Sequence, residues 1–315
     1  MNAAIGFVAV LALAAPAGAQ ELEFATVDQA RQMLAAKDAF VERLSPFDRA
    51  ARLKTNRTVT EAEFLEFVAS AALAWDAAER DAIAAAYGQV EPKIRALHLP
   101  LPPKVFVVKT TGQEEGDTVY TRQTAVMIPR SKTGANPELL RLFAHELFHV
   151  ASRANPALAE RLYAVIGFHK CSEATYPATL APRKLTNPDA PRNDNCIRVA
   201  LDGQPVAATP ILFSRSESYD PARGGEFFDY VQLGLLVRAG PGEPPTTERV
   251  VGLQQVTGFF EQVGQNTQYV IHPEEILADN FALLVLDAPN VKSPAVLAGL
   301  RRALVEFNAA EAGPR

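Results

Sequence analysis

The segment LLRLFAHELFHVASR, residues 139–153, constrains the fold most strongly, because its apolar residues recur at helical spacing. A helix of this kind must bury its apolar side, and residues four positions apart then lie on one face. His145 and His149 form such a pair. The tripeptide Asn-Pro-Glu at 136–138 supplies an N-cap, a proline in the first turn and an acid near the positive end of the helix dipole. We therefore expect a helix to begin there and to end near Arg153, before a second Asn-Pro pair.

Two imidazoles on one helical face can direct their nitrogens at a single point, which is what a zinc ion requires. Glu146 lies one residue further round the helix, so its carboxylate can reach a metal-bound water molecule without binding the metal. The chain has only five histidines, and a chance His-Glu-x-x-His motif in such a chain is roughly a one-in-a-few-hundred event. We interpret His145 and His149 as metal ligands and Glu146 as a general base.

A catalytic zinc ion keeps three protein ligands and one open position, so a third ligand is needed. A third histidine six residues after the second is excluded, because that position is Asn155. Downstream, the segment HPEEILADNFALL offers Glu275 and Asp279 four residues apart, on one face of a helix that Pro273 would begin.

The string HELFH, followed at a distance by EILAD, resembles the two ligand helices of the gluzincin clan of zinc metallopeptidases. The resemblance covers these two helices and implies that Glu275 is the third zinc ligand. It also implies that Asp279 accepts a hydrogen bond from the remote ring nitrogen of His145. Glu274 is the rival ligand, although its partner four residues on would be the inert Ala278.

The oxyanion of the transition state needs a hydrogen-bond donor besides the metal. The candidates are Tyr269 and His272, which precede the second ligand helix, and Tyr219 or Tyr230 further upstream. In enzymes that resemble gluzincins, the strand before the first metal helix runs along the cleft. The segment 123–130 is interpreted either as that strand or as plain sheet core.

The length of 315 residues and the apolar content of 48% allow one large domain or two lobes. Residues 20–99 are expected to form a helical N-terminal lobe, in which Thr60 and Glu63 make a capping box. Residues 100–315 are expected to form a zincin-like metallopeptidase domain with an insertion at 155–265. The predicted fold class is α+β, with a small mostly antiparallel sheet, the active-site helix and C-terminal helices.

The N-terminal segment 1–19 has an apolar centre and ends in Ala17-Gly18-Ala19, a pattern typical of a signal-peptidase site. It carries no Lys or Arg, so an uncleaved membrane anchor is the alternative to a cleaved signal peptide. Both interpretations indicate an exported protein, either periplasmic or secreted.

The cysteines, Cys171 and Cys196, suit an oxidising compartment and are expected to form a disulfide bond. Two separate buried thiols are the alternative. A zinc site that uses both thiolates is disfavoured, because the sequence has no Cys-x-x-Cys pair.

A net charge of −5 without a dense run of Lys and Arg argues against nucleic acid and anionic lipid as partners. No later segment is apolar for long enough to insert stably into a membrane once the signal is removed. We therefore expect an exported zinc-dependent metallopeptidase with one Zn²⁺ per chain, acting on a peptide or protein substrate; the sequence leaves the oligomeric state open. The alternative is a non-catalytic zinc-containing envelope binding or scaffold protein with a covered cleft, in which Glu146 would have no use.

Overall fold

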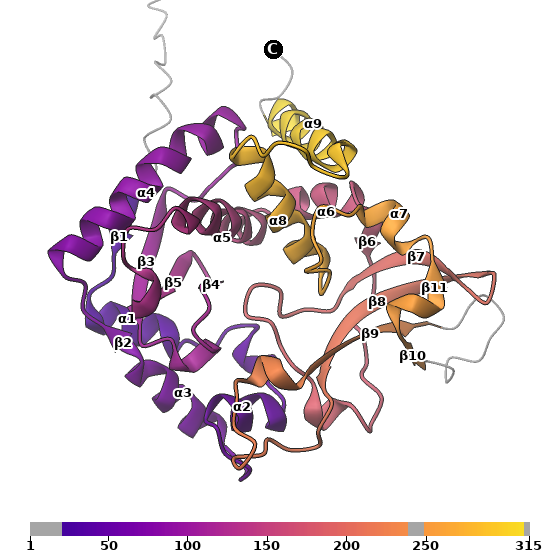
Figure 1. Cartoon of the computed structure of the whole chain (residues 1–315), viewed down its shortest axis with the longest axis horizontal. Coiled ribbons are helices and arrows are strands. Elements are labelled where there is room, and N and C mark those ends of the chain that lie inside the picture. The colour runs from indigo at the N-terminus through magenta and orange to yellow at the C-terminus, as the bar shows by residue number, and fades with distance from the viewer. Residues whose placement is uncertain (1–20, 239–248, 312–315) are drawn as a thin grey trace, which may run out of the picture.

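The structure is a computed structural model that describes residues 21–238 and 249–311, so the predicted signal segment 1–19 lies outside the described residues. It is a mixed α+β structure with two small sheets. Figure 1 shows the first sheet and the N-terminal helices on one side, the second sheet on the other, and the C-terminal helices between and above them.

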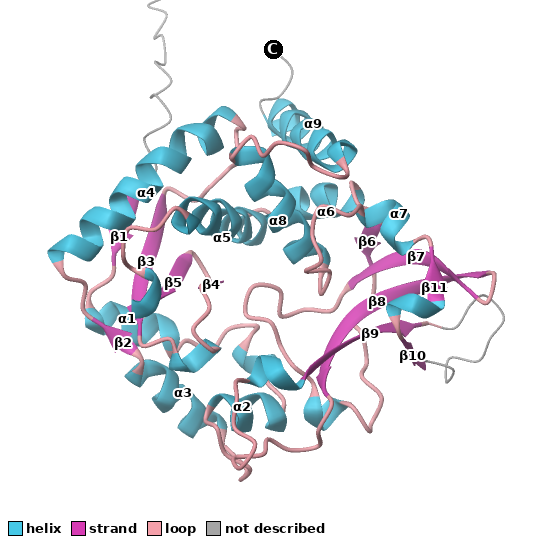
Figure 2. Cartoon of the chain, in the orientation of Figure 1, coloured by secondary structure: helices cyan, strands magenta, loops and turns pink. Residues whose placement is uncertain are grey.

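The helices, coloured in Figure 2, are α1 (Val27–Leu34), α2 (Pro46–Arg52), α3 (Glu61–Ser70), α4 (Ala77–Ala96), α5 (Glu138–Ala154), α6 (Pro156–Ala164), α7 (Phe259–Val263), α8 (Pro273–Val285) and α9 (Pro294–Glu311). The strands of the first sheet are β1 (Glu21–Phe24), β2 (Ala72–Leu73), β3 (Lys104–Thr110), β4 (Tyr120–Arg122) and β5 (Ala125–Pro129). Those of the second are β6 (Phe168–Lys170), β7 (Asn195–Leu201), β8 (Gln204–Ser214), β9 (Val231–Val237), β10 (Arg249–Val251) and β11 (Val256–Thr257). None of the described helices combines the length and the apolar character needed to cross a bilayer.

The first sheet has the order β1-β3-β5-β4, with β2 beside β3. The expectation of a mostly antiparallel sheet is wrong here, because β1, β3 and β5 are parallel neighbours. The chain leaves β3, forms the antiparallel β4–β5 hairpin and inserts β5 between β3 and β4, so that β5 runs in the same direction as β3. Apolar strand patterns carry no information on direction. As a result, β4 lies at one edge of this sheet, and β1 lies at the other end of the strand order.

The N-terminal helices cover both faces of the first sheet. Alternate residues of a strand point to opposite faces, and Val107 of β3 packs with α4 and α5 whereas Val108 packs with α1 and α3. In β5, Val126 packs in the same core as Val107, and Met127 packs in the same core as Val108. The predicted boundary near residue 99 therefore does not coincide with a gap in the packing.

The predicted helix starts are present in the structure. Thr60 and Glu63 form the expected capping box at the start of α3. At α5, the Asn136 side chain accepts a hydrogen bond from the backbone N–H of Glu138 at 2.9 Å. The helix ends at Ala154, because Pro156 begins α6 in a new direction.

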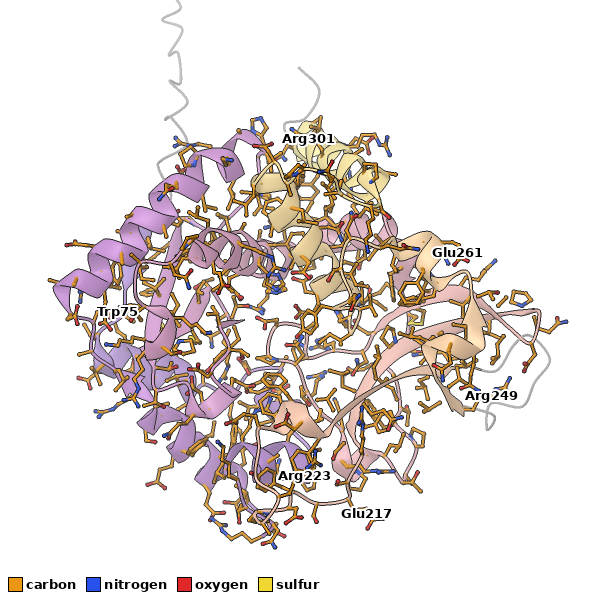
Figure 3. The ribbon with its side chains drawn as sticks, viewed as in Figure 1. Trp75, Glu217, Arg223, Arg249, Glu261 and Arg301 are labelled. Carbon is orange, nitrogen blue, oxygen red and sulfur yellow. A yellow bond between two sulfur atoms is a disulfide. The ribbon has the colours of Figure 1, made fainter. Side chains whose placement is uncertain are left out.

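Charged side chains at the outer edge of the molecule mark the solvent side of these layers. Figure 3 shows Glu217, Glu261 and Arg301 toward the periphery, and all three are exposed. Trp75 is mostly buried, and its ring lies 5.2 Å from that of Phe24 in an edge-to-face arrangement. This contact ties β1 to the start of α4.

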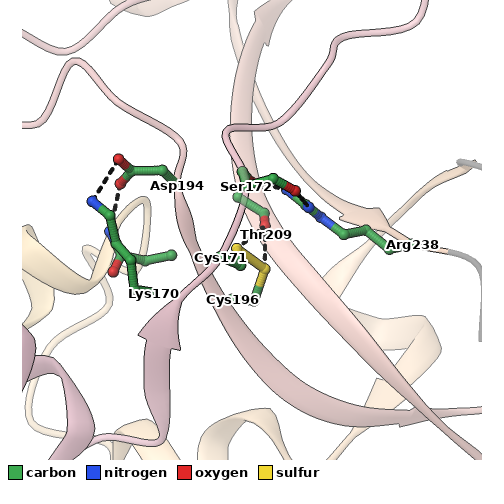
Figure 4. Close-up of a disulfide and its surroundings, with 8 residues drawn as sticks. Lys170, Cys171, Ser172, Asp194, Cys196, Thr209 and Arg238 are labelled. Atoms are coloured by element: carbon green, nitrogen blue, oxygen red, sulfur yellow. Dashed lines mark hydrogen bonds and ion pairs between the residues drawn. A yellow bond between two sulfur atoms is a disulfide. The ribbon is translucent and has the colours of Figure 1, made fainter.

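The predicted insertion forms the second sheet, which is antiparallel throughout the described residues. The predicted disulfide between Cys171 and Cys196 is confirmed, with an S–S distance of 2.06 Å. Figure 4 shows this bond beside Thr209, whose hydroxyl lies 3.3 Å from the sulfur of Cys196. The bond ties the segment after β6 to β7.

Replacing Cys171 and Cys196 together by serine is expected to lower the free energy of unfolding by about 3 kcal/mol, because the bond closes a loop with a sequence separation of 25. Urea unfolding of the oxidised wild type and of the double variant measures this loss. A reducing agent should destabilise the wild type and leave the variant unchanged. Equal stability of the two oxidised proteins would contradict the expectation.

Candidate metal centre

The two ligand helices, α5 and α8, pack against each other in the core. His145 Nε2 lies 3.2 Å from Glu275 Oε2, and His149 Nε2 lies 3.6 Å from the same oxygen. One atom from each of these three side chains lies within 4.8 Å of the other two. Two imidazoles and a carboxylate that converge in this way could hold a divalent metal ion.

Glu274 has a different role from its neighbour. Its Oε1 accepts a hydrogen bond from His149 Nδ1 at 2.8 Å, and the hydroxyls of Ser152 and Tyr163 donate to the same carboxylate. It is buried and faces the remote nitrogen of His149 rather than the metal position. The structure therefore places Glu275, not the rival Glu274, beside both imidazoles.

Asp279 lies where the resemblance puts it. Its Oδ1 accepts hydrogen bonds from His145 Nδ1 at 3.1 Å and from Arg141 at 2.6 Å, and Thr267 donates to Oδ2. Each histidine thus donates a hydrogen bond from Nδ1 to a carboxylate, because His149 Nδ1 is bonded to Glu274 in the same way. This arrangement fixes the orientation of both rings and leaves both Nε2 atoms directed at Glu275.

The electrostatics of the cluster favour positive charge at its centre. Burial lowers the pKa of His145, but hydrogen bonds to Asp279 and Glu275 outweigh it and raise that pKa to about 9. For His149, Glu275 and Asp189 likewise outweigh burial and raise the pKa well above its usual value. Burial raises the pKa of Glu275, yet the two histidines hold it well below its usual range. A bound divalent cation would replace the protons on these histidines as the source of positive charge beside Glu275.

Two buried polar atoms at the centre have no hydrogen-bond partner among the described residues: His149 Nε2 and Glu146 Oε2. Leaving such an atom unsatisfied costs about 1–3 kcal/mol, so each requires an explanation. A metal ion would satisfy the nitrogen, and a water molecule on that ion would satisfy the carboxylate. The residues present therefore fit a metal ion.

Glu146 is almost completely buried, with 3% of its surface exposed. Burial and the nearby Asp189 raise its pKa to about 8. Glu146, His149 and Asp189 form a second group whose ligand atoms lie within 4.8 Å of one another. Asp189 was not among the predicted site residues, because it comes from the Pro-rich stretch of the insertion and has no characteristic spacing to the helix motif.

A cavity of about 620 Å³ opens beside the cluster, which is within the size range of ligand sites. His145, Glu146 and Glu275 line the end of the cavity that lies at the candidate metal centre. Leu142, Val119 and Phe228 are among the apolar residues of its wall. A substrate group can therefore approach the histidines and Glu146 from one side.

Tyr269 lines this cavity and is 43% exposed. Desolvation and the neighbouring carboxylates of Glu275 and Asp189 raise the pKa of its hydroxyl well above the usual value. The hydroxyl therefore keeps its proton at neutral pH and is a candidate hydrogen-bond donor to a substrate.

The expectation that His272 is an oxyanion donor is wrong. Its Nδ1 accepts a hydrogen bond from the backbone N–H of Glu274, and its Nε2 donates to the carbonyl oxygen of Arg192. Because both ring nitrogens are used, His272 is the N-cap of α8. Tyr219 and Tyr230 are corrected in the same way, since both are buried and donate to backbone carbonyls in the loop before β9.

The segment 123–130 contains β5, which lies between β3 and β4 and is buried along its length, so its interpretation as sheet core holds. The edge strand next to the cavity is β4, and Tyr120 lines the cavity wall. The backbone N–H and the hydroxyl of Thr121 in β4 both donate to Asp189 Oδ1 at 2.6 Å. The insertion therefore contacts the edge of the first sheet beside the candidate metal centre.

No family model matches this chain, and comparison with the curated proteins and with the solved structures gives no match.

Proposed function

We propose that this chain is a zinc-dependent metallopeptidase of gluzincin type with a zincin-like arrangement of its metal helices. The observation that carries the proposal is the convergence of His145, His149 and Glu275 beside Glu146, whose Oε2 has no hydrogen-bond partner in the described part of the chain. A site with three protein ligands and a base poised next to it suits hydrolysis. The carboxylates on both Nδ1 atoms support the same interpretation.

A bound zinc ion would act as a Lewis acid on a scissile carbonyl and make a water molecule more acidic. Glu146 accepts the proton of that water molecule and passes it to the leaving amine. Burial and the nearby Asp189 raise the pKa of Glu146, so its carboxylate is a stronger base than that of an exposed glutamate. Tyr269, which lines the same cavity, donates a hydrogen bond to the developing oxyanion.

We further infer that the chain acts outside the cytoplasm on peptides or proteins. The disulfide between Cys171 and Cys196 is typical of an oxidising compartment. The composition of segment 1–19 supports export in the same sense.

A non-catalytic metal protein is the second candidate, and Asp189 is the observation that favours it. Asp189 brings a further carboxylate from the insertion to Glu146 and His149. A purely structural zinc site closes with four protein ligands. The cavity that reaches His145 and Glu146 favours the peptidase instead, because a covered centre needs no approach for a substrate.

Purified protein is expected to contain about one zinc ion per chain and to cleave a mixed peptide library. Treatment with 1,10-phenanthroline should remove the metal and the cleavage together, and added zinc should restore both. The non-chelating 1,7-phenanthroline serves as the control. Cleavage that persists after complete removal of metal would refute the proposal, whereas stoichiometric zinc without any cleavage would support the non-catalytic candidate.

A further inference from the structure

A short segment of the insertion, residues 185–189, connects the N-terminal helices to the candidate metal centre. At one end, Thr186 binds Asp48 of α2 through both its backbone N–H and its hydroxyl, at 3.0 and 2.9 Å. At the other end, Asp189 accepts two hydrogen bonds from Thr121 of the edge strand β4. Asn187 lies between these anchors and lines the main cavity.

The side-chain amide of Asn187 has only one orientation that satisfies its surroundings. Its Oδ1 accepts a hydrogen bond from the backbone N–H of Asp189 at 3.0 Å. A backbone N–H can only donate, so the oxygen of the amide must lie on that side. The NH₂ group then faces Glu275 and donates to its Oε1 at 2.6 Å.

Because of this hydrogen bond, the two carboxylate oxygens of Glu275 have different partners. Oε1 is taken by Asn187, while Oε2 is the oxygen that faces the Nε2 atoms of both histidines. A carboxylate without such a partner can bind a metal ion through one oxygen or through both. We propose that Asn187 is a positioning residue that holds Glu275 in one-oxygen ligation and thereby keeps a coordination position open. This proposal rests on the metal centre of the proposed function.

The segment is held firmly enough for this task. Pro188 restricts the backbone of Asn187 to extended conformations. Arg153 of α5 donates to the carbonyl oxygen of Asp189 at 3.1 Å and to the Thr121 hydroxyl at 2.9 Å. Asn187 is therefore positioned by contacts on both sides, as a group that orients a metal ligand must be.

Asn187→Asp and Asn187→Ala test the proposal. The aspartate keeps the acceptor for the Asp189 N–H but loses the donor to Glu275, and the alanine loses both. We expect both variants to bind zinc about 10–100-fold more weakly than the wild type, measured by competition with a chromophoric chelator. Asn193→Asp is the matched control, because the Asn193 amide donates to the carbonyl oxygen of Pro210 elsewhere in the insertion.

The Co²⁺-substituted proteins give a spectroscopic test that does not depend on activity. The wild type should show intense visible absorption, which is typical of Co²⁺ with a low coordination number. The Asn187 variants should show a weaker band, because Glu275 is then free to bind through both oxygens and the coordination number rises. Urea unfolding and circular dichroism check that the variants are folded. A wild-type spectrum typical of six ligands would overturn the proposal even if neither variant folded.

Unchanged zinc affinity and an unchanged Co²⁺ spectrum in both variants would also overturn it. A wild type that binds no zinc at all would instead refute the metal centre itself, and with it the proposed function. The two failures are therefore distinguishable in one set of measurements.

Discussion

Replacing Glu146 by glutamine is expected to lower kcat for peptide cleavage by about 10²–10⁴-fold and to leave the zinc content unchanged. Glutamine has nearly the same shape but cannot accept the proton of a water molecule. In the structure Glu146 Oε2 is buried and has no partner among the described residues, so the loss should be chemical rather than structural. Steady-state kinetics on a fluorogenic peptide, together with metal analysis, measure both quantities.

Glu138→Gln is the control for this experiment, because Glu138 lines the same cavity but is exposed at the start of α5. It removes a negative charge from the cavity without removing the base. Full activity of Glu146→Gln would contradict the proposed mechanism. Loss of zinc from that variant would show that Glu146 binds the metal instead of acting beside it.

Replacing Arg52 by methionine is expected to lower the free energy of unfolding by about 3–5 kcal/mol, because it leaves two buried carboxylates without their partner. Arg52 is fully buried and forms ion pairs with Asp48 at 2.8 Å and with Glu115 at 2.6 Å. It also donates to the carbonyl oxygen of Thr186 at 3.1 Å. Burial raises the pKa of Glu115 to about 7 even with Arg52 beside it, which shows how poorly this site would accommodate an unpaired charge.

Urea unfolding of wild type and variant measures this loss. Arg57→Met is the matched control, because Arg57 pairs with Glu63 on the surface, where solvent screens the charges and no measurable change is expected. A loss from Arg52→Met no larger than that of the control would show that the buried cluster does not stabilise the fold. Because Thr186 adjoins Asn187, zinc affinity measured in parallel would show whether the cluster also supports the metal centre.

Much of the local structure could be predicted. The apolar spacing in 139–153 predicts α5, and the Pro-Glu-Glu start predicts α8, because helix periodicity and capping depend on nearby residues. The disulfide followed from the presence of two cysteines and from the expectation that the chain is exported. The direction of β5 did not follow, because a strand inside a sheet has the same apolar pattern whether it is parallel or antiparallel to its neighbour.

Some features of the candidate site could likewise be predicted from the sequence, and others could not. Spacing alone placed His145 and His149 on one face, whereas the roles of His272 and Glu274 depended on which way their side chains point in the folded chain. The His272 side chain caps the N-terminus of α8, and the Glu274 carboxylate faces Nδ1 of His149. Neither orientation is encoded in residue spacing, since adjacent residues of a helix face different neighbours.

The amino-acid sequence by itself determined the pair of imidazoles and the carboxylate next to them, because a helix places residues of fixed separation on a fixed face. Only the tertiary structure decided that Asn187 and Asp189 join them, and that Glu275 rather than Glu274 faces both imidazoles. These residues come from another helix and from a loop of the insertion, and their approach depends on the packing of α5 against α8 and on the anchoring of segment 185–189. Such contacts are set by the burial of side chains across the whole core, which no local pattern of residues specifies.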